Sequence, residues 1–401
     1  MISAASRPYI DASVPVLRQH GLAITTTFYR NMFEAHPELT NLFNMGNQAN
    51  GAQQQSLASA VFAYAANIGA PEALGPVVKR IVHKHVSIGI RAQHYPIVGH
   101  HLLGAIKHTL GDAATPELLA AWAEAYTSLA NLMVAAEQDM YAEAGIEPGA
   151  TRPMRVTEVV KESDNVLSIR MVADDGAPLP PFQAGQYISC AVTFADGHRQ
   201  LRQYSLSDAP GQDSMRISVK REVAGTAAGA ATPAGEVSNW IHDNVTVGSV
   251  LQVSHPFGEF TPDTESDQPI VLLSAGVGIT PMIAALKRIQ QVNPARAVIF
   301  AHAARDARHH AHQADLAAAR AVMPNLHDVI FYETESDAPR ALHGLMDIGR
   351  LPAWPLAEAN VYLCGPLPFM QAQWMALRAA GVPAERLHRE VFGPDLLDNL
   401  L

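Results

Sequence analysis

The spacing of apolar residues changes twice along this chain of 401 residues, and each change restricts the folds available to it. Up to about residue 147 the apolar side chains recur every three or four positions, as Leu119, Trp122 and Tyr126 do, which is typical of helices packed on a core. From residue 154 the period becomes two, and from residue 265 buried strands alternate with helices. We therefore predict a multidomain chain, with an all-α domain over residues 1–147, a linker over 148–153, an antiparallel β-barrel domain over 154–264 and an α/β domain with a parallel sheet over 265–401.

Composition and charge exclude several classes of protein. Hydrophobic residues make up 48% of the chain and charged residues 16%, which is typical of a folded globular protein. The formal net charge is −10 and no basic tract is present, so we expect neither nucleic acid nor a membrane as a partner. Cys190 and Cys364 are too few for a disulfide framework, and the N-terminus lacks the basic and apolar regions of a signal peptide. These features together predict a cytoplasmic location.

An apolar helical stripe in the first domain has His85 at its centre. The stripe is formed by Leu74, Val78, Ile81, Val82 and Ile88. Taken alone, a histidine in such a stripe is more often an ordinary core residue than a metal ligand. Tyr29 and Gln53 also interrupt apolar helical faces, where a polar group is costly unless it has a partner. Tyr95 and Glu137 could receive the imidazole N–H of His85, although Glu137 could equally be a solvated acid near a helix end.

Two motifs of the barrel domain could contact a cofactor. The segment Arg202-Gln203-Tyr204-Ser205 alternates like a strand, with Arg202 and Tyr204 on one face, and by itself it could be an ordinary half-buried strand. Ser238 follows an Ala/Gly-rich stretch over 224–235 that we expect to be a loop. We expect Ser238 to be the N-cap of a helix whose free N–H groups could receive an anion. Capped helices are common, so this motif supports a cofactor site only beside Arg202 and Tyr204.

A glycine loop joins a buried strand to a helix that is expected to begin near Pro281. Gly276 and Gly278 permit close approach of the backbone to a phosphate, and a helix start favours negative charge. Pro281 stands where the dinucleotide fingerprint has its third glycine, so the loop alone is weak support for a nucleotide site. The histidine-rich run over 309–312 could suggest a metal site. It has no cysteine or acidic cluster at ligand spacing, so a solvated helix start is the simpler interpretation.

Residues 1–147 resemble a bacterial globin, and the whole chain resembles the flavohaemoglobin family from end to end. The resemblance implies that His85 is the proximal ligand of a haem b iron, with Tyr95 and Glu137 hydrogen-bonded behind it. It places Tyr29 and Gln53 in the distal pocket as catalytic groups. Three further residues would contact the haem: Phe43 on the porphyrin, Leu57 on the distal side, and Lys84 at a propionate or toward the flavin.

The remainder of the chain resembles the FAD- and NAD(P)H-binding module of ferredoxin-reductase-type flavoproteins. The resemblance implies that Arg202 meets the FAD phosphates, that Tyr204 and Ser205 contact the isoalloxazine, and that Glu390 and Phe392 lie where nicotinamide must enter. The other cofactor-binding residues that it implies are Tyr187, Gln203, Ser238, Gly276, Val277, Gly278, Ile279, Thr280, Pro281, Cys364, Gly365 and Pro366. Cys364 is then a pocket residue and not a metal ligand.

The function implied by this resemblance is that of a nitric oxide dioxygenase, in which NAD(P)H reduces FAD, electrons pass to haem, and nitric oxide is oxidised by O2 to nitrate. The expected partners are O2, nitric oxide and NAD(P)H, in a monomer whose distal pocket could also hold a lipid. Two other functions stay open: an O2- or redox-sensing haem protein, and an NAD(P)H reductase for an external acceptor such as a hydroperoxide or ferric iron. The choice between NADH and NADPH is also open, since Arg305 and Arg308 could meet a 2′-phosphate or be surface charges.

Overall fold

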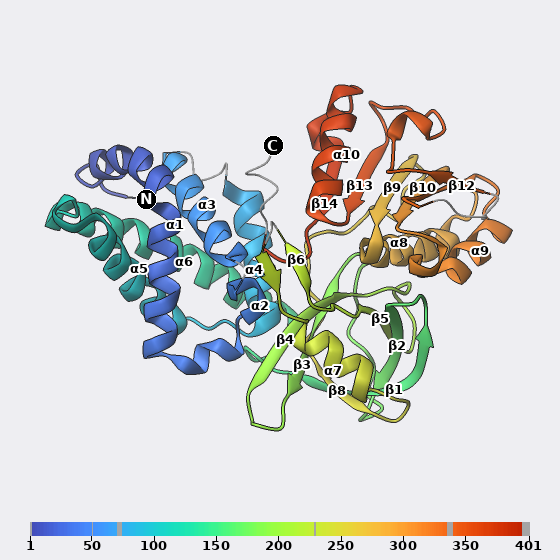
Figure 1. Cartoon of the computed structure of the whole chain (residues 1–401), viewed down its shortest axis with the longest axis horizontal. Helices are drawn as coiled ribbons and strands as arrows, with labels where there is room; N and C mark the ends of the chain where they lie inside the picture. Colours follow the sequence, from blue (N-terminus) through green and yellow to red (C-terminus); the bar gives the residue numbers. More distant parts are fainter. Residues whose placement is uncertain (1, 50, 70–73, 228–229, 335–339, 395–401) are drawn as a thin grey trace. The chain divides into compact units, whose positions relative to one another are not determined.

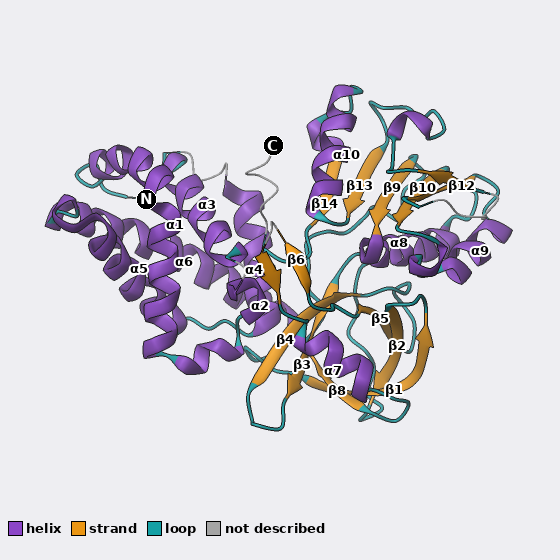
Figure 2. Cartoon of the chain, in the orientation of Figure 1, coloured by secondary structure: helices purple, strands orange, loops and turns teal. Residues whose placement is uncertain are grey.

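The computed structural model describes residues 2–49, 51–69, 74–227, 230–334 and 340–394. The chain divides into two units, one of Met1–Thr151 with Ala191–Arg202 and the other of Arg152–Cys190 with Gln203–Leu401. In the described residues up to Ala144 the regular structure is helical, and strands begin at Arg152 (Figure 2). The change in apolar spacing along the sequence therefore marks a change from helix to sheet. None of the helices in these ranges combines the length and the apolar character needed to cross a membrane.

Helices of different lengths form most of the first unit (Figure 1). They are α1 (Arg7–Ala35), η1 (Pro37–Asn41), α2 (Met45–Ala49), α3 (Ala52–Ala66), α4 (Gly75–Ile88), α5 (His94–Leu110), η3 (Gly111–Ala113) and α6 (Pro116–Ala144). Helix α1 packs against α3, α5 and α6, and its side chains Phe28 and Met32 are buried in the shared core. Local signals set the ends of α6, since Thr115 accepts a hydrogen bond from the Leu118 N–H and Gly145 closes the helix in the left-handed conformation.

An antiparallel sheet comes next along the chain. Its strands are β1 (Arg152–Lys161), β2 (Val166–Ala173), β3 (Tyr187–Thr193), β4 (Arg199–Ser205), β5 (Met215–Lys220) and β8 (Val250–Val253), in the order β4-β3-β8-β1-β2-β5. A bridge between Leu206, which follows β4, and Ile217 in β5 connects the two edge strands of this order. The sheet therefore closes toward a barrel, and Ile169, Ile188 and Ile217 are among its fully buried side chains.

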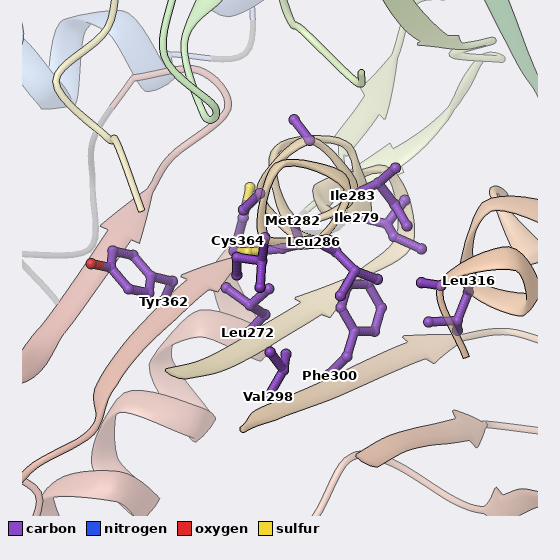
Figure 3. Packing of buried hydrophobic residues seen from close by; sticks show 14 of the residues in the cluster. Leu272, Ile279, Met282, Ile283, Leu286, Val298, Phe300, Leu316, Tyr362 and Cys364 are labelled. Atoms are coloured by element: carbon purple, nitrogen blue, oxygen red, sulfur yellow. The ribbon is translucent and has the colours of Figure 1, made fainter. Parts of the chain in front are cut away.

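A parallel sheet with helices follows, as the alternation in the sequence predicts. The strands β9 (Ile270–Ala275), β10 (Val298–Ala304), β11 (Leu326–Tyr332), β12 (Ala341–His343), β13 (Asn360–Cys364) and β14 (Leu387–Glu390) lie in the order β12-β11-β10-β9-β13-β14. The helices are α8 (Ile279–Val292), α9 (Gln313–Val322) and α10 (Leu367–Ala379). Figure 3 shows Leu286 of α8 packed over Leu272 and Phe300 of the sheet, and all three side chains are fully buried. Short 3-10 turns complete this part of the chain: η4 (Gly276–Gly278), η5 (Ala307–His309), η6 (Ile348–Arg350) and η7 (Ala384–Arg386).

One expectation about secondary structure is wrong. The stretch over 224–235, expected to be a loop, contains the antiparallel strand pair β6 (Gly225–Ala227) and β7 (Ala230–Thr232), followed by α7 (Glu236–Asn244). Glycine and alanine weaken strands without preventing backbone pairing, so composition alone conceals a short hairpin. Helix α8 begins at Ile279, directly after the η4 turn, which agrees with the expected start near Pro281.

Candidate functional site

The His85 side chain is held from behind by a buried carboxylate. Its Nδ1 atom lies 2.7 Å from Oε1 of Glu137 on α6 and 3.2 Å from the hydroxyl of Tyr95 on α5. Glu137 is only 2% exposed, so it is not a solvated acid. Because Oε1 of Glu137 also accepts from the Tyr95 hydroxyl, this oxygen acts as an acceptor, and Nδ1 of His85 carries a proton toward it. The described hydrogen bonds of this ring all involve Nδ1, so Nε2 is the atom that could bind a metal.

Tyr95 completes the support of Glu137. Its hydroxyl donates to Glu137 Oε1, and the hydroxyl of Tyr126 donates to the backbone oxygen of Tyr95 at 2.7 Å. Burial, the hydrogen bond to Glu137 and the charge of that residue all raise the pKa of Tyr95, so its phenol stays a neutral donor. A glycine makes room for this arrangement, because a Cβ at Gly99 would lie 2.5 Å from Cε1 of Tyr126.

Tyr29 and Gln53 lie close together, as the distal-pocket expectation requires. Burial raises the pKa of Tyr29 to about 12, although hydrogen bonds to the side chains of Gln53 and Gln48 act in the opposite direction. The Tyr29 ring contacts Phe43 edge-on, with 5.8 Å between ring centroids, and stacks on Phe33 at the same distance. Gln48 and Phe33 were not identified from the sequence. Gln48 lies in a helix of five residues, which is too short to show a periodic pattern.

The remaining residues expected to contact haem differ in their surroundings. Phe43 and Leu57 are partly buried and pack against the core of the first unit. Lys84 is half-buried on α4, next to His85, and its backbone oxygen accepts a hydrogen bond from the Ser87 hydroxyl. The aromatic and aliphatic surfaces are thus suited to contact a flat apolar group.

Strand β4 carries the proposed flavin-contacting residues. Arg202 and Tyr204 are half-buried on one face of the strand, and Ser205 is buried on the other. The Arg202 guanidinium bonds Gln200 Oε1 at 3.0 Å and the backbone oxygen of Leu201 at 2.7 Å, and Gln203 reaches the Ser189 hydroxyl at 3.3 Å. Residues 202–205 lie within strand β4, as the sequence predicts.

Tyr187 lies at the start of the neighbouring strand β3. Its side chain is buried, and its backbone pairs with Phe257 through hydrogen bonds of 2.8 and 2.9 Å. A Cβ added at Gly258 would lie 3.1 Å from two ring atoms of Tyr187, so the glycine permits this ring to pack closely.

The expectation that Ser238 caps α7 is wrong. Helix α7 has Gly235 as its N-cap and no side-chain cap, and Ser238 lies inside the first turn. The Ser238 hydroxyl donates to the Gly235 backbone oxygen at 3.1 Å and accepts from the Glu222 N–H at 3.2 Å. A Cβ at Gly235 would lie 2.7 Å from the Ser238 hydroxyl oxygen and 2.9 Å from Cβ of Glu222, so a glycine here leaves room for these contacts. The Ser238 hydroxyl therefore connects the start of α7 to Glu222, in the segment that follows β5.

The η4 turn and the Cys364–Pro366 loop lie against each other at the ends of neighbouring strands. A Cβ at Gly278 would lie 2.3 Å from the backbone oxygen of Cys364, so only glycine fits. Gly276 has φ +55° and nothing within 4 Å of its missing Cβ, which leaves open space above the turn. The Cys364 side chain is fully buried in the core, so this residue meets the turn through its backbone and not as a lining thiol. An open glycine turn at a helix start fits a phosphate group.

The other residues of the proposed nucleotide site lie at the start of α8, after β13, and at or after the end of β14. Ile279, Thr280 and Pro281 are buried, and the Thr280 hydroxyl donates to the Val277 backbone oxygen at 3.0 Å. A Cβ at Gly365 would lie 3.2 Å from the backbone nitrogen of Ala275, which brings Gly365 and Pro366 beside the glycine turn. Glu390 is 6% exposed at the end of β14, whereas Phe392 is 45% exposed.

The histidine run over 309–312 is not a solvated helix start. His310 and His312 are buried, and α9 begins only at Gln313. The carboxylates of Glu162 and Asp315 approach His312. Asp315 is only three residues away in the sequence, but Glu162 comes from the barrel, 150 residues away, so local spacing could not reveal it.

Comparison with known proteins follows the same three parts. Residues 26–133 match the globin family, residues 153–261 the oxidoreductase FAD-binding domain, and residues 272–374 the oxidoreductase NAD-binding domain. A flavohemoprotein of Rhizobium meliloti is 44% identical over 408 residues, covering 99% of this chain and 99% of that protein. This chain belongs to the flavohemoprotein family. A second flavohemoprotein, from Chromobacterium violaceum, is 47% identical and covers 98% of both chains.

Solved structures agree with this family. A flavohemoglobin from Malassezia yamatoensis, with bound FAD and heme, has a TM-score of 0.86 at 29% identity and covers 98% of this chain and 100% of its own. The flavohem-like FAD/NAD-binding domain of a nitric oxide dioxygenase from Vibrio cholerae has a TM-score of 0.56 at 37% identity, covering 61% of this flavohemoprotein and 100% of its own chain. The predicted order of a helical globin domain, an antiparallel-sheet FAD-binding domain and a parallel-sheet NAD-binding domain is confirmed. The domain limits at 147, 153 and 264 stay predictions.

Proposed function

We propose that this flavohemoprotein is an NAD(P)H-dependent nitric oxide dioxygenase that oxidises nitric oxide with O2 to nitrate. The observation that carries the proposal is the His85 ring, whose Nδ1 is held at 2.7 Å by the buried carboxylate of Glu137. This arrangement directs Nε2 away from the protein's own hydrogen bonds and makes it a strong ligand. Membership in the family and the likeness to the Vibrio cholerae domain support the same reaction.

The residues of the first unit fit a haem b group. His85 would hold the iron through Nε2, while Glu137 and Tyr95 keep its proton on Nδ1 and increase its electron donation. Phe43 and Leu57 would pack on the ring, and Lys84 would face a propionate. A carboxylate behind the proximal histidine favours activation of O2 over its storage.

On the opposite side, Tyr29 and Gln53 would act as hydrogen-bond donors. Burial raises the pKa of Tyr29 to about 12, so its hydroxyl keeps its proton at every physiological pH. A neutral donor in a buried site stabilises developing negative charge without reorganisation. Gln48, which lies close to the same hydroxyl, would orient it.

The antiparallel sheet and the α/β part of the chain fit FAD and a nicotinamide dinucleotide. Arg202, Gln203, Tyr204, Ser205, Tyr187 and Ser238 would contact FAD. The dinucleotide cradle would be formed by Gly276, Val277, Gly278, Ile279, Thr280, Pro281, Cys364, Gly365 and Pro366. Glu390 and Phe392 would lie where nicotinamide enters. When bound, FAD and haem supply the splitting of a hydride into single electrons and the oxidation of nitric oxide by O2. The open space above Gly276, beside the start of α8, supports the cradle assignment.

The remaining expectations belong to the same proposal. O2 and nitric oxide are its small-molecule partners, the chain acts as a monomer in the cytoplasm, and the apolar distal side could also accept a lipid. Both cysteines are free and buried, which agrees with a reducing compartment.

The proposal is tested by measuring NADH consumption and nitrate formation in aerobic buffer, with and without nitric oxide, using the haem- and FAD-loaded protein. The expected result is rapid NADH oxidation that depends on nitric oxide and yields nitrate. Slow oxidation that nitric oxide does not accelerate would instead identify a sensor. Oxidation driven by a hydroperoxide or ferric iron, and unchanged in Tyr29→Phe, would identify a reductase for an external acceptor.

A further inference from the structure

His312 occupies an unusual backbone position between β10 and α9. Its φ is +62°, and among the described residues it is the one non-glycine residue with positive φ. The side chain is also fully buried. Because this conformation is unfavourable for a residue with a Cβ, surrounding contacts must hold it.

Both ring nitrogens of His312 are engaged, and they reach different domains. Nε2 lies 2.9 Å from the hydroxyl of Ser218 on barrel strand β5, and Nδ1 lies 2.8 Å from Oδ2 of Asp315 on α9. The His312 N–H also donates to Oε2 of Glu162, at 3.2 Å, and Glu162 Oε1 accepts from the Ser168 hydroxyl at 2.6 Å. Since Asp315 accepts, Nδ1 of His312 carries a proton toward it, and Nε2 is hydrogen-bonded to the Ser218 hydroxyl.

Charged residues of both domains surround this ring. Arg216 of β5 lies 2.8 Å from Asp315, and Lys287 of α8 lies 3.3 Å from Asp315 and 2.6 Å from Asp208. Burial alone would raise the pKa of Asp315, but hydrogen bonds from His312 and Arg216 and the charge of Lys287 bring it below its ordinary value. Asp315 is therefore ionised, and its charge is already balanced by neighbouring cations.

The order Ser218, His312, Asp315 is that of a hydrolytic triad, and Glu162, His312 and Asp315 lie close enough for a metal ion. Neither role suits the site. Ser218 and His312 are 4% and 0% exposed, so no substrate reaches the hydroxyl. Arg216 and Lys287 occupy the carboxylate that a cation would need. What these contacts do is connect the barrel, through Ser218, with the nucleotide domain, through Asp315.

The location of this connection matters, because strand β5 also packs against the η4 turn. The turn is the proposed dinucleotide cradle, and the barrel is the proposed flavin site. We propose that His312 is a positioning residue for hydride transfer, which bridges Ser218 of the barrel and Asp315 of the nucleotide domain and so sets the approach of nicotinamide to flavin. This inference rests on the proposed function only in requiring NAD(P)H to reduce FAD.

The transfer moves one hydride, with both of its electrons, from the reduced nicotinamide to the flavin, so that the nicotinamide is oxidised and the flavin reduced. Its rate depends steeply on distance, and a displacement of about 1 Å can cost on the order of 100-fold. Loss of the bridge should therefore slow hydride transfer more than it weakens NADH binding.

Two small substitutions test the bridge. Ser218→Ala removes one oxygen atom and leaves the ring, whereas His312→Asn keeps a donor for Asp315 and tolerates the left-handed backbone but cannot reach Ser218. His327→Asn, at an exposed position on β11, is the matched control. Flavin reduction by NADH is followed by stopped flow in the absence of O2, with and without deuterated NADH to obtain the isotope effect. The NADH dissociation constant is measured separately. Amide hydrogen exchange is followed over 215–220 (β5) and 313–322 (α9).

We expect both variants to bind FAD and NADH with near-native affinity, to reduce flavin about 10- to 100-fold more slowly, and to exchange amides faster in both segments. Their double variant should be no slower than the slower single variant, because the two residues act through one contact. If FAD-loaded Ser218→Ala reduces flavin at the native rate with native exchange, the inference is wrong even if His312→Asn fails to fold. Failure of the native protein to reduce its flavin with NADH would instead overturn the proposed function.

Discussion

The Nδ1 atom of His85 on α4 lies 2.7 Å from a carboxylate oxygen of Glu137 on α6, and that carboxylate is almost completely buried. Burying a charge is costly unless it is hydrogen-bonded, and here the imidazole and the Tyr95 hydroxyl both satisfy it. The contact fixes the orientation of the ring and the nitrogen that bears its proton.

Glu137→Gln should keep the hydrogen bond to His85 but remove the negative charge. We expect haem to be retained and nitric-oxide-dependent NADH oxidation to fall by about 10- to 100-fold, because the imidazole becomes a weaker electron donor. Glu143→Gln, at an exposed position on the same helix, is the control. Native turnover per haem in Glu137→Gln would show that the carboxylate has no role in the reaction.

Tyr29→Phe should change how stability depends on alkaline pH. An unfolded tyrosine ionises near pH 10, whereas burial raises the pKa of Tyr29 to about 12. The contribution of this raised pKa to the free energy of unfolding is therefore fully present below pH 10 and is lost as pH rises from 10 to 12. The urea midpoint should fall less between pH 9 and 11 in Tyr29→Phe than in the native protein or in Tyr9→Phe, which changes an exposed ring. Equal declines in all three proteins would contradict the buried-phenol assignment.

His310→Gln should reduce acid sensitivity. Burial, followed by the charge of His312, lowers the pKa of His310 to about 4, whereas the unfolded residue binds a proton near 6.5. The unfolded state therefore binds more protons in this window, and stability is lost as pH falls from 6.5 to 4, by on the order of 3 kcal/mol. The free energy of unfolding, measured by urea at pH 7 and pH 5, should fall less in His310→Gln than in the native protein. His327→Gln is the exposed control. If the free energy of unfolding falls as steeply in His310→Gln as in His327→Gln, the prediction is wrong.

Gly278→Ala and Gly276→Ala should fail differently. The first places a Cβ 2.3 Å from the Cys364 backbone oxygen, so β9 and β13 must separate and stability should fall by about 2 kcal/mol or more. The second meets no atom, and its left-handed φ of +55° costs about 1 kcal/mol, but its methyl group fills the proposed phosphate space. We expect a lowered Tm for Gly278→Ala, and a raised KM for NADH with a smaller change in Tm for Gly276→Ala. A native KM in Gly276→Ala would argue against a cradle at this turn.

Much of the site was recognisable in the sequence because single residues interrupt a regular pattern. His85, Tyr29 and Glu137 stand out as polar groups on apolar helical faces, and Gly276 and Gly278 stand out at a strand–helix junction. Gln48 gave no such signal, because it lies in a helix of one turn. Ser238 gave a false one, because serine is favoured both as an N-cap and in the first turn of a helix, and only the observed helix start distinguishes the two.

The sequence by itself determined the three-part architecture, because apolar period is a local property that hydrogen-bonding geometry imposes on every helix and strand. Only the tertiary structure decided which distant groups meet. The carboxylate of Glu137 reaches His85 across 52 residues, and the hydroxyl of Ser218 reaches His312 across 94. Such pairings depend on how helices and sheets pack, and packing places side chains together without leaving a regular spacing in the chain.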